Sequence, residues 1–298
     1  MIHILTTALG DYDLYGSNSG NDTLTGTVDY GSLYGYAGND LFVADASNVY
    51  MFGGTGNDTY SLTAGTGNGS EVIAQTGEGT NTIDLHDVDP SNVELATDSS
   101  GNLYVQYDSN DYVEIAAGLA SNSGSTANQY VQNITFDDGT TWNIAAGASL
   151  TTFAGDYNLY GMSSGNDTLT VTNGYANVYA YGDNNEIVTE ATNDTLYGGN
   201  SATDFVFQGA QAYNANATIA DFSLVKGDKI DLSPLLSAYT PGTSTLADFV
   251  QAVPDGAGDT VLQVDSTGSG THFQTVATLT GVSTVNVNSY VSSGNLIV

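Results

Sequence analysis

Large apolar or aromatic side chains recur at every ninth position over residues 15–60. Stepping back in nines from Tyr60 reaches five further such residues: Met51, Phe42, Leu33, Leu24 and Tyr15. A short strand and a tight turn together take about nine residues, so the spacing predicts strands that each bury one large side chain. No long stretch has helical periodicity, and glycine, threonine, asparagine and serine are abundant. The pattern therefore predicts an all-β chain with many turns.

The turns between these strands carry glycine, asparagine and aspartate in a fixed order. The clearest copy is "GGTGNDTYS", in which Asp58 is the sixth residue, and Gly-Asn-Asp also precedes the strands after Asp22 and Asp40. Glycines allow positive φ and let the turn bring its carbonyl groups inward. The three aspartates are 18 residues apart, which is the length of one coil of two strands and two turns. We therefore expect them to form one column along the edge of a parallel β-roll.

This column predicts a calcium site between successive coils. Stacked carboxylates repel one another at short range unless a cation lies between them. Carboxylate and turn carbonyl oxygens together make the all-oxygen shell that Ca²⁺ prefers. On the opposite edge, Gly31 and Val49 occupy the equivalent positions and offer no side-chain ligand. Only one edge of the roll is therefore predicted to be well loaded with calcium.

A second copy of the pattern follows in the later part of the chain. The stretch "TTALGDYDLYGSNSGNDTLTG" from Thr6 returns as "TTFAGDYNLYGMSSGNDTLTV" from Thr151. The series of large apolar side chains at every ninth position, here called the apolar ladder, also returns, at Tyr160, Leu169, Val178, Ile187, Leu196 and Phe205. Fewer of the ligand positions hold aspartate than in the first copy, and Asp167 and Asp194 are the weaker metal candidates. We expect an internal duplication whose second roll holds fewer calcium ions or none.

The nonapeptide resembles the RTX, or haemolysin-type, calcium-binding repeat. "GGTGNDTYS" matches that repeat fully, "GYAGNDLFV" matches it nearly, and "YGSNSGNDTL" carries one insertion between its glycines. The resemblance implies a parallel β-roll in which calcium binds turn carbonyls and the aspartate carboxylate. Carried over position by position, it implies these ligands: Gly35, Ala37 and Asp40; Gly53, Thr55 and Asp58; and Asp22.

The segments after each roll differ from one another. The stretches "NTIDLHDV", "NVELATDSSGNLYVQY" and "YVQNITFDDGTTWNI" alternate and contain turn residues, which predicts hairpins with Trp142 in a core. Residues 216–298 resemble the C-terminal targeting domain of proteins exported by type I secretion, on "IADFSLVKGDKIDLSPLL", "LADFVQ", "TVLQVDSTGSGTHFQTVATLTGV" and "GNLIV". The predicted organisation is a β-roll over 1–65, a β-rich segment over 66–150, a degenerate β-roll over 151–215 and a targeting domain over 216–298.

Composition restricts the partners. The chain carries 33 Asp and Glu against 2 Lys and Arg, for a net charge of −31, which argues against nucleic acid or an anionic membrane and favours multivalent cations. An apolar fraction of 40% with 20 Tyr argues against disorder. There is no cysteine, no apolar run of transmembrane length and no basic N-terminal signal. The resemblance instead places the export address at the C-terminus.

Two functional hypotheses remain. The three histidines are far apart in sequence and form no catalytic motif, and the roll begins near residue 10, ahead of which RTX enzymes usually carry a catalytic domain. We therefore expect a secreted, non-enzymatic structural or adhesive protein of the bacterial surface, which self-assembles in calcium. Its expected partners are calcium, copies of itself, a type I secretion transporter and cell-surface polysaccharide. The alternative is a carbohydrate-binding or carbohydrate-active protein, for which exposed aromatic side chains beside two carboxylates in one groove would be diagnostic.

Overall fold

The computed structural model describes residues 3–7, 11–65, 69–74, 78–117, 119–120, 124–152 and 156–298. Short strands dominate these residues, which confirms the predicted all-β fold class. The chain divides into two units. Unit 1 comprises Met1–Ala148 and Met162–Ser164, and unit 2 comprises Ser149–Gly161 and Gly165–Val298. Among the described residues, no helix is both long and apolar enough to cross a membrane.

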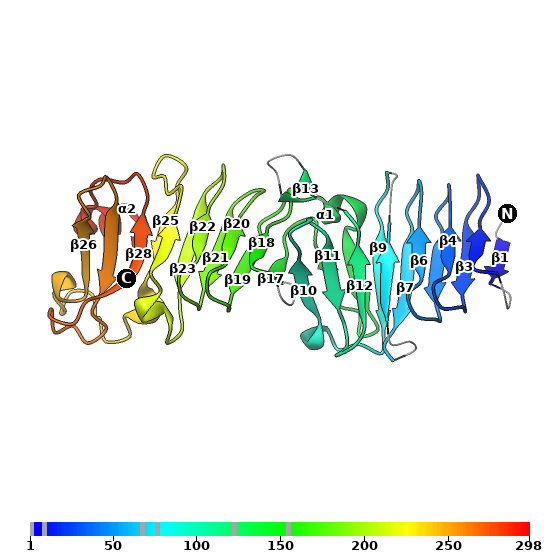
Figure 1. Ribbon diagram of the computed structural model, residues 1–298, viewed down its shortest axis with the longest axis horizontal. Coiled ribbons are helices and arrows are strands. Elements are labelled where there is room, and N and C mark those ends of the chain that lie inside the picture. Colours follow the sequence, from blue (N-terminus) through cyan, green and yellow to red (C-terminus); the bar gives the residue numbers. More distant parts are fainter. Residues whose placement is uncertain are drawn as a thin grey trace. The chain divides into compact units, whose positions relative to one another are not determined.

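Unit 1 begins with a parallel β-roll, in which the chain alternates between two sheets (Figure 1). One sheet contains β1 (His3–Thr6), β3 (Asp22–Gly26), β5 (Leu41–Ala44), β7 (Thr59–Thr63) and β9 (Thr82–His86). The other contains β2 (Asp13–Tyr15), β4 (Ser32–Tyr34), β6 (Tyr50–Phe52) and β8 (Ser70–Ile73). Neighbouring strands in each sheet are parallel, as the repeat predicts. The parallel coils continue past residue 65 through β8 and β9.

Two groups of strands complete unit 1; each joins the roll in parallel, and the strands within each group are antiparallel. The first sheet is extended by β15 (Asn133–Phe136) and β16 (Thr141–Asn143), and the second by β12 (Tyr112–Ile115), β11 (Leu103–Gln106) and β10 (Glu94–Thr97). The hairpins predicted for "NVELATDSSGNLYVQY" and "ITFDDGTTW" are present as β10–β11 and β15–β16. The hairpin predicted for "NTIDLHDV" is wrong, because β9 pairs in parallel with both β7 and β15. Trp142 is half-buried at the edge strand β16, where it meets Phe136 edge to face.

Short elements connect these strands. They are η1 (Pro90–Asn92), β13 (Leu119–Ala120), β14 (Gly124–Ser125) and α1 (Ala127–Tyr130).

The core of the roll follows the nine-residue ladder with one exception. Leu24, Phe42 and Tyr60 in one sheet and Leu33 and Met51 in the other are fully buried. The prediction for Tyr15 is wrong: its side chain is 54% exposed. Leu14 instead pairs with Leu33. The insertion in "YGSNSGNDTL" moves β2 by one residue, and a slip of one residue turns every side chain of a strand to the other face.

Unit 2 repeats this plan. One sheet contains β17 (Ser149–Thr152), β19 (Thr168–Val171), β21 (Asn185–Thr189), β23 (Thr203–Phe207), β25 (Lys229–Asp231) and β29 (Leu296–Ile297). The other contains β18 (Asn158–Tyr160), β20 (Asn177–Tyr179), β22 (Thr195–Tyr197), β24 (Ala217–Ile219), β28 (Gln274–Leu279), β27 (Thr260–Val264) and β26 (Val250–Pro254). The strands up to β28 and β29 are parallel, and β26 to β28 form an antiparallel end.

The remaining elements of unit 2 are short. They are η2 (Ala212–Asn214), η3 (Ser233–Leu235), η4 (Leu246–Asp248) and α2 (Val287–Ser293).

The second ladder has the same one-residue shift at its start. Leu169, Ile187 and Phe205 are fully buried as predicted, and so are Val178 and Leu196. The prediction for Tyr160 is wrong, because Leu159 is the fully buried residue of β18 and pairs with Val178.

The displaced tyrosines join aromatic stacks on the outer face of each roll. Tyr15, Tyr34 and Phe52 stack with ring centroids 5.0 and 4.7 Å apart. In unit 2, Tyr160, Tyr179 and Tyr197 stack at 5.1 and 4.8 Å. The side chains that leave the core therefore form a continuous column outside it.

Candidate calcium sites

The predicted carboxylate column is present along one edge of unit 1. Strand register places Asp22 beside Asp40 and Asp40 beside Asp58, and all three side chains are buried. Asp40 and Asp58 each accept a hydrogen bond from the amide of the preceding column residue: Asp22 N to Asp40 Oδ1 is 2.8 Å, and Asp40 N to Asp58 Oδ1 is 3.0 Å. Asn81 Oδ1 continues the column by accepting from Asp58 N at 2.8 Å. One carboxylate oxygen of Asp40 and of Asp58 therefore links the coils.

The second oxygen of Asp40 faces a turn carbonyl. Asp40 Oδ2 is buried and has no hydrogen-bond donor among the described residues. A Cβ atom placed on Gly35 would lie 2.5 Å from this oxygen and 2.6 Å from Gly53 O, so two acceptors converge on the space beside Gly35. Two oxygens without a shared donor repel each other, and a cation between them removes that repulsion. The residues present therefore fit Ca²⁺, which prefers carboxylate and carbonyl oxygens.

The first coil has a related arrangement. A Cβ on Gly16 would lie 2.9 Å from Asp22 Oδ2 and 3.0 Å from Gly35 O. Here the amide of Ser17 donates to Asp22 Oδ2, and His3 Nδ1 lies 2.9 Å from Asp22 Oδ1. Although burial opposes it, these hydrogen bonds hold the pKa of Asp22 below its usual value. Asp22 is therefore better supplied with protein donors than Asp40.

The other predicted ligands are main-chain oxygens, and they divide into two groups. The carbonyls of Gly35 and Gly53 face the carboxylates, as described above. The carbonyls of Ala37 and Thr55 accept from the amides of Gly20 and Gly38 at 3.1 and 3.0 Å, so they also join neighbouring coils.

Side chains alone do not make a metal site here. In the part of the chain that the structure describes, no three His, Asp or Glu side chains gather where they could hold a metal ion. A calcium ion in this column must therefore take main-chain oxygens.

The opposite edge of unit 1 holds two buried carboxylates that the sequence analysis missed. Register places Glu71 in the column of Val49, and Glu71 and Asp111 are 4% and 2% exposed. The hydroxyl of Tyr107 donates to Glu71 Oε2 at 3.0 Å, and Gly65 N donates to Asp111 Oδ2 at 3.1 Å. The order Asn110-Asp111 before β12 repeats the Asn-Asp order of the nonapeptide and could have indicated Asp111. No sequence signal indicated Glu71.

Protons compete with cations for these carboxylates. Burial, with a smaller contribution from the charges of Asp58 and Asp22, raises the pKa of Asp40 to about 6, while the Asp22 amide opposes the rise. Burial likewise raises the pKa of Glu71 to about 7. The folded state therefore holds these protons more tightly than the unfolded chain does, so protonation stabilises the fold.

We expect metal-free unit 1 to become more stable as the pH falls from 7 to 5. The stability gained on protonation is present below the unfolded-state pKa and is lost as the pH rises through about 6 for Asp40 and about 7 for Glu71. Each group should contribute on the order of 1 kcal/mol over this range. Thermal unfolding, monitored by circular dichroism in metal-free buffer from pH 7 to pH 5, measures this change in stability. Asp40→Asn and Glu71→Gln should each reduce the pH dependence, whereas Asp45→Asn, at an exposed position, should not.

Unit 2 places its two candidate carboxylates on different edges. Asp167 lies in the column that continues with Asn185, whose Oδ1 accepts from Asp167 N at 2.7 Å. Asp194 lies on the other edge, where Oδ1 accepts from Ala176 N at 3.0 Å and Oδ2 from the Thr189 hydroxyl at 2.8 Å. Both carboxylate oxygens of Asp194 thus have protein donors, and the structure does not bring Asp167 and Asp194 together.

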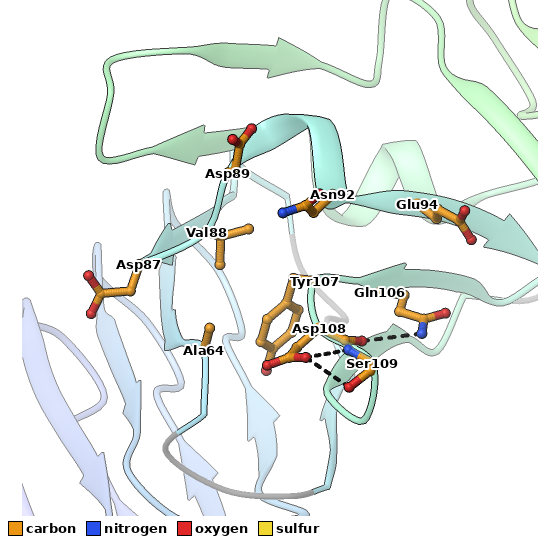
Figure 2. A pocket seen from close by; sticks show the side chains of 10 residues that line it. All are labelled: Ala64, Asp87, Val88, Asp89, Asn92, Glu94, Gln106, Tyr107, Asp108 and Ser109. Atoms are coloured by element: carbon orange, nitrogen blue, oxygen red, sulfur yellow. Dashed lines mark hydrogen bonds between the residues drawn. The ribbon is translucent and has the colours of Figure 1, made fainter.

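A pocket of about 450 Å³ in unit 1 bears on the carbohydrate alternative (Figure 2). Its lining includes Asp87, Asp89, Glu94 and Asp108, and Figure 2 shows Asp87 and Glu94 at opposite ends. The aromatic side chain in the lining is Tyr107, which is 6% exposed and bonded to Glu71. The pocket therefore lacks the exposed aromatic platform that the alternative predicted.

Two comparisons with known proteins show little similarity. No curated protein matches the chain. A solved structure, the extracellular lipase LipA from Serratia marcescens, aligns with 98% of this chain at 18% identity and a TM-score of 0.26. This chain spans 40% of the lipase, and a likeness of this size carries no argument about function.

A family model identifies the repeats. The model of the RTX calcium-binding nonapeptide repeat (four copies) matches residues 17–48, 34–70 and 177–202. The first two matches contain the Gly35 and Gly53 turns and the carboxylate column of unit 1. Asp22, Asp40 and Asp58 therefore lie in segments that match the RTX calcium-binding nonapeptide repeat.

Proposed function

We propose that this chain is a secreted, calcium-stabilised structural protein of the bacterial surface, which assembles with copies of itself into sheets or filaments. The RTX repeats support calcium binding, and proteins with such repeats are generally secreted. We assign it no catalytic role. Export by a type I secretion transporter, read from residues 216–298, and attachment to cell-surface polysaccharide belong to the same proposal.

The observation that carries the assembly proposal is the strand at the end of the first roll. Among the described residues, β1 pairs with β3 on one side only, and Ile4 is 78% exposed. A strand with an unpaired edge and an exposed apolar side chain is a template for another strand. A second copy of this chain can supply that strand, because its own β1 has the same unpaired edge.

Calcium connects this edge to the ion sites. His3 of β1 lies 2.9 Å from Asp22, so the end strand rests directly on the carboxylate column. Calcium binding in the first coils therefore also positions β1. Two chains of net charge −31 repel each other at low ionic strength, and calcium bound in the rolls lowers that repulsion.

We expect monomers in chelator and ordered sheets or filaments in millimolar Ca²⁺. Electron microscopy and light scattering of the purified protein at both conditions measure the change. Ile4→Lys should abolish assembly, because a charge on an edge strand opposes pairing, while the calcium-induced change in circular dichroism remains. Val225→Lys, at a position that is 98% exposed in unit 2, makes the same change of charge and should assemble normally.

Two outcomes would contradict the proposal. One is a protein that stays monomeric at every calcium concentration and binds or cleaves a polysaccharide. The other is equal assembly of the Ile4→Lys variant and the wild type.

A further inference from the structure

Two column positions of unit 2 carry hydrogen-bond donors, whereas the column of unit 1 carries carboxylates, among them Asp40 with one oxygen that has no donor among the described residues. We propose that the chain's own donors take the place of calcium along unit 2, so that unit 2 folds without calcium and unit 1 requires it. The RTX family model matches residues 177–202, but in and after that segment donors of the chain itself bind the turn carbonyls that would face calcium. This inference goes beyond the proposed function, because it holds whether or not the protein assembles.

Strand register identifies the equivalent positions. The column of unit 2 runs through Asp167, Asn185, Thr203 and Asp228. Its second and third members are neutral, whereas the corresponding members in unit 1 are Asp40 and Asp58.

Both neutral residues donate to the carbonyls of their own turns. The Asn185 amide donates to Tyr181 O, and the Thr203 hydroxyl donates to Gly198 O at 2.8 Å. Calcium accepts only lone pairs, and an N–H or O–H group directed at the same carbonyl takes its place. At these two turns the protein therefore supplies the positive end of a dipole in place of an ion.

The space beside the turn glycine differs between the two units. Gly35 and Gly198 each lie five residues before a column residue. A Cβ on Gly35 would meet Asp40 Oδ2 and Gly53 O, two acceptors. A Cβ on Gly198 would meet Thr203 Oγ1 at 3.2 Å, where Gly35 has the carboxylate of Asp40. An aromatic ring lies 2.9 Å from the Cβ position in both turns, Phe42 at Gly35 and Phe205 at Gly198, so the difference is the hydroxyl donor in place of a carboxylate.

At the next coil of unit 2, the ammonium group of a lysine contacts the turn carbonyl. Lys226 Nζ donates to Gly199 O at 2.6 Å and lies 3.4 Å from Asp221 Oδ2 and 3.5 Å from Asp228 Oδ2. One turn carbonyl and two carboxylates thus surround a positive charge. The ammonium group has three donors for these acceptors and is held on the chain itself.

On the opposite edge of unit 2, protein donors also satisfy the carboxylate oxygens. Thr189 and Ala176 already donate to the two oxygens of Asp194. Asp167 keeps its carboxylate, but the next residue of its column, Asn185, supplies a donor in place of a second carboxylate.

Hydrogen exchange with mass spectrometry on the full chain tests the proposal. In chelator, peptides from 156–298 should keep their protection within about twofold of that in Ca²⁺, while peptides from 11–65 should lose about tenfold or more. An equal loss in both units would overturn the proposal. Failure of assembly would leave these peptides unchanged, so this test is separate from that of the proposed function.

Restoring the carboxylates should create calcium sites in unit 2. Asn185→Asp together with Thr203→Asp should make protection of 156–298 rise with Ca²⁺ by about tenfold. Asn184→Asp adds a charge at the neighbouring exposed position and should have no such effect. If the double variant folds equally well without calcium, the donors are not replacing ions.

The two lysines provide a matched pair. Lys226→Met removes the enclosed ammonium and should reduce protection of 156–298 in chelator, with recovery in Ca²⁺. Lys229→Met removes a half-exposed ammonium that pairs with Asp204 at 3.2 Å, and it should leave protection unchanged. Equal behaviour of the two variants would contradict the role assigned to Lys226.

Discussion

Replacing Asp40 and Asp58 together by asparagine is expected to uncouple the folding of unit 1 from calcium. Each substitution removes the negative charge of a column carboxylate but keeps an oxygen that can accept the interstrand amide hydrogen bond. Calcium affinity depends on the number of charged ligands, so each change should weaken binding by about tenfold or more. By linkage, the stabilisation at a given calcium concentration falls by about 1.4 kcal/mol per tenfold.

Circular dichroism and calorimetry across a calcium titration measure this effect. Wild-type protein should lose part of its β signal in chelator and regain it with Ca²⁺ more than with Mg²⁺, because the smaller ion demands a tighter octahedral shell. Asp45→Asn makes the same change of charge at an exposed position and should titrate like the wild type. An unchanged melting temperature of wild-type protein in chelator would refute calcium-linked folding.

A large loss of stability from one substitution is expected for Gly56→Ala. Gly56 has a φ of 127°, and a Cβ there would lie 1.8 Å from Gly38 O of the preceding coil. Gly38 meets Gly20 O in the same way, so the turns stack backbone on backbone. A methyl group must separate the coils and strain the backbone, which should cost at least about 3 kcal/mol of unfolding free energy.

Gly65→Ala is the matched control. Gly65 also has a positive φ, 74°, but a Cβ there meets nothing within 4 Å. Its substitution should cost about 1 kcal/mol through backbone strain alone. Chemical denaturation of both variants in saturating Ca²⁺ compares them. Similar losses for Gly56→Ala and Gly65→Ala would show that close stacking of the turns does not limit stability.

The column at the edge of unit 1 was predictable because its spacing is a property of the chain alone. Two strands and two turns fix the coil at 18 residues, so Asp22, Asp40 and Asp58 had to align once the strands stacked in parallel. The nine-residue apolar ladder identified the core for the same reason. Its failures at Tyr15 and Tyr160 come from one cause, the insertion in the first turn of each copy, which shifts the preceding strand by one residue.

Features that depend on contacts across the fold were not predictable from the repeat. Glu71 becomes buried because register places it above Val49, and its partner Tyr107 comes from a different hairpin. In unit 2 the sequence showed only that aspartate is absent from several ligand positions. That Thr203 and Lys226 donate to turn carbonyls follows from the distances to Gly198 O and Gly199 O, and Lys226 lies outside the repeat altogether.

The aromatic stacks on the outer faces give each roll an optical signature. Rings held face to face at about 5 Å are electronically coupled, and they keep that arrangement only while neighbouring coils stay in register. The stack of unit 1 ends in Phe52, whereas that of unit 2 consists of Tyr160, Tyr179 and Tyr197. With unit 1 dependent on calcium and unit 2 not, as proposed above, the near-ultraviolet optical activity of the unit 1 stack should be lost in chelator, and that of the unit 2 stack should remain. The protein carries its own chromophores for following each roll without an added label.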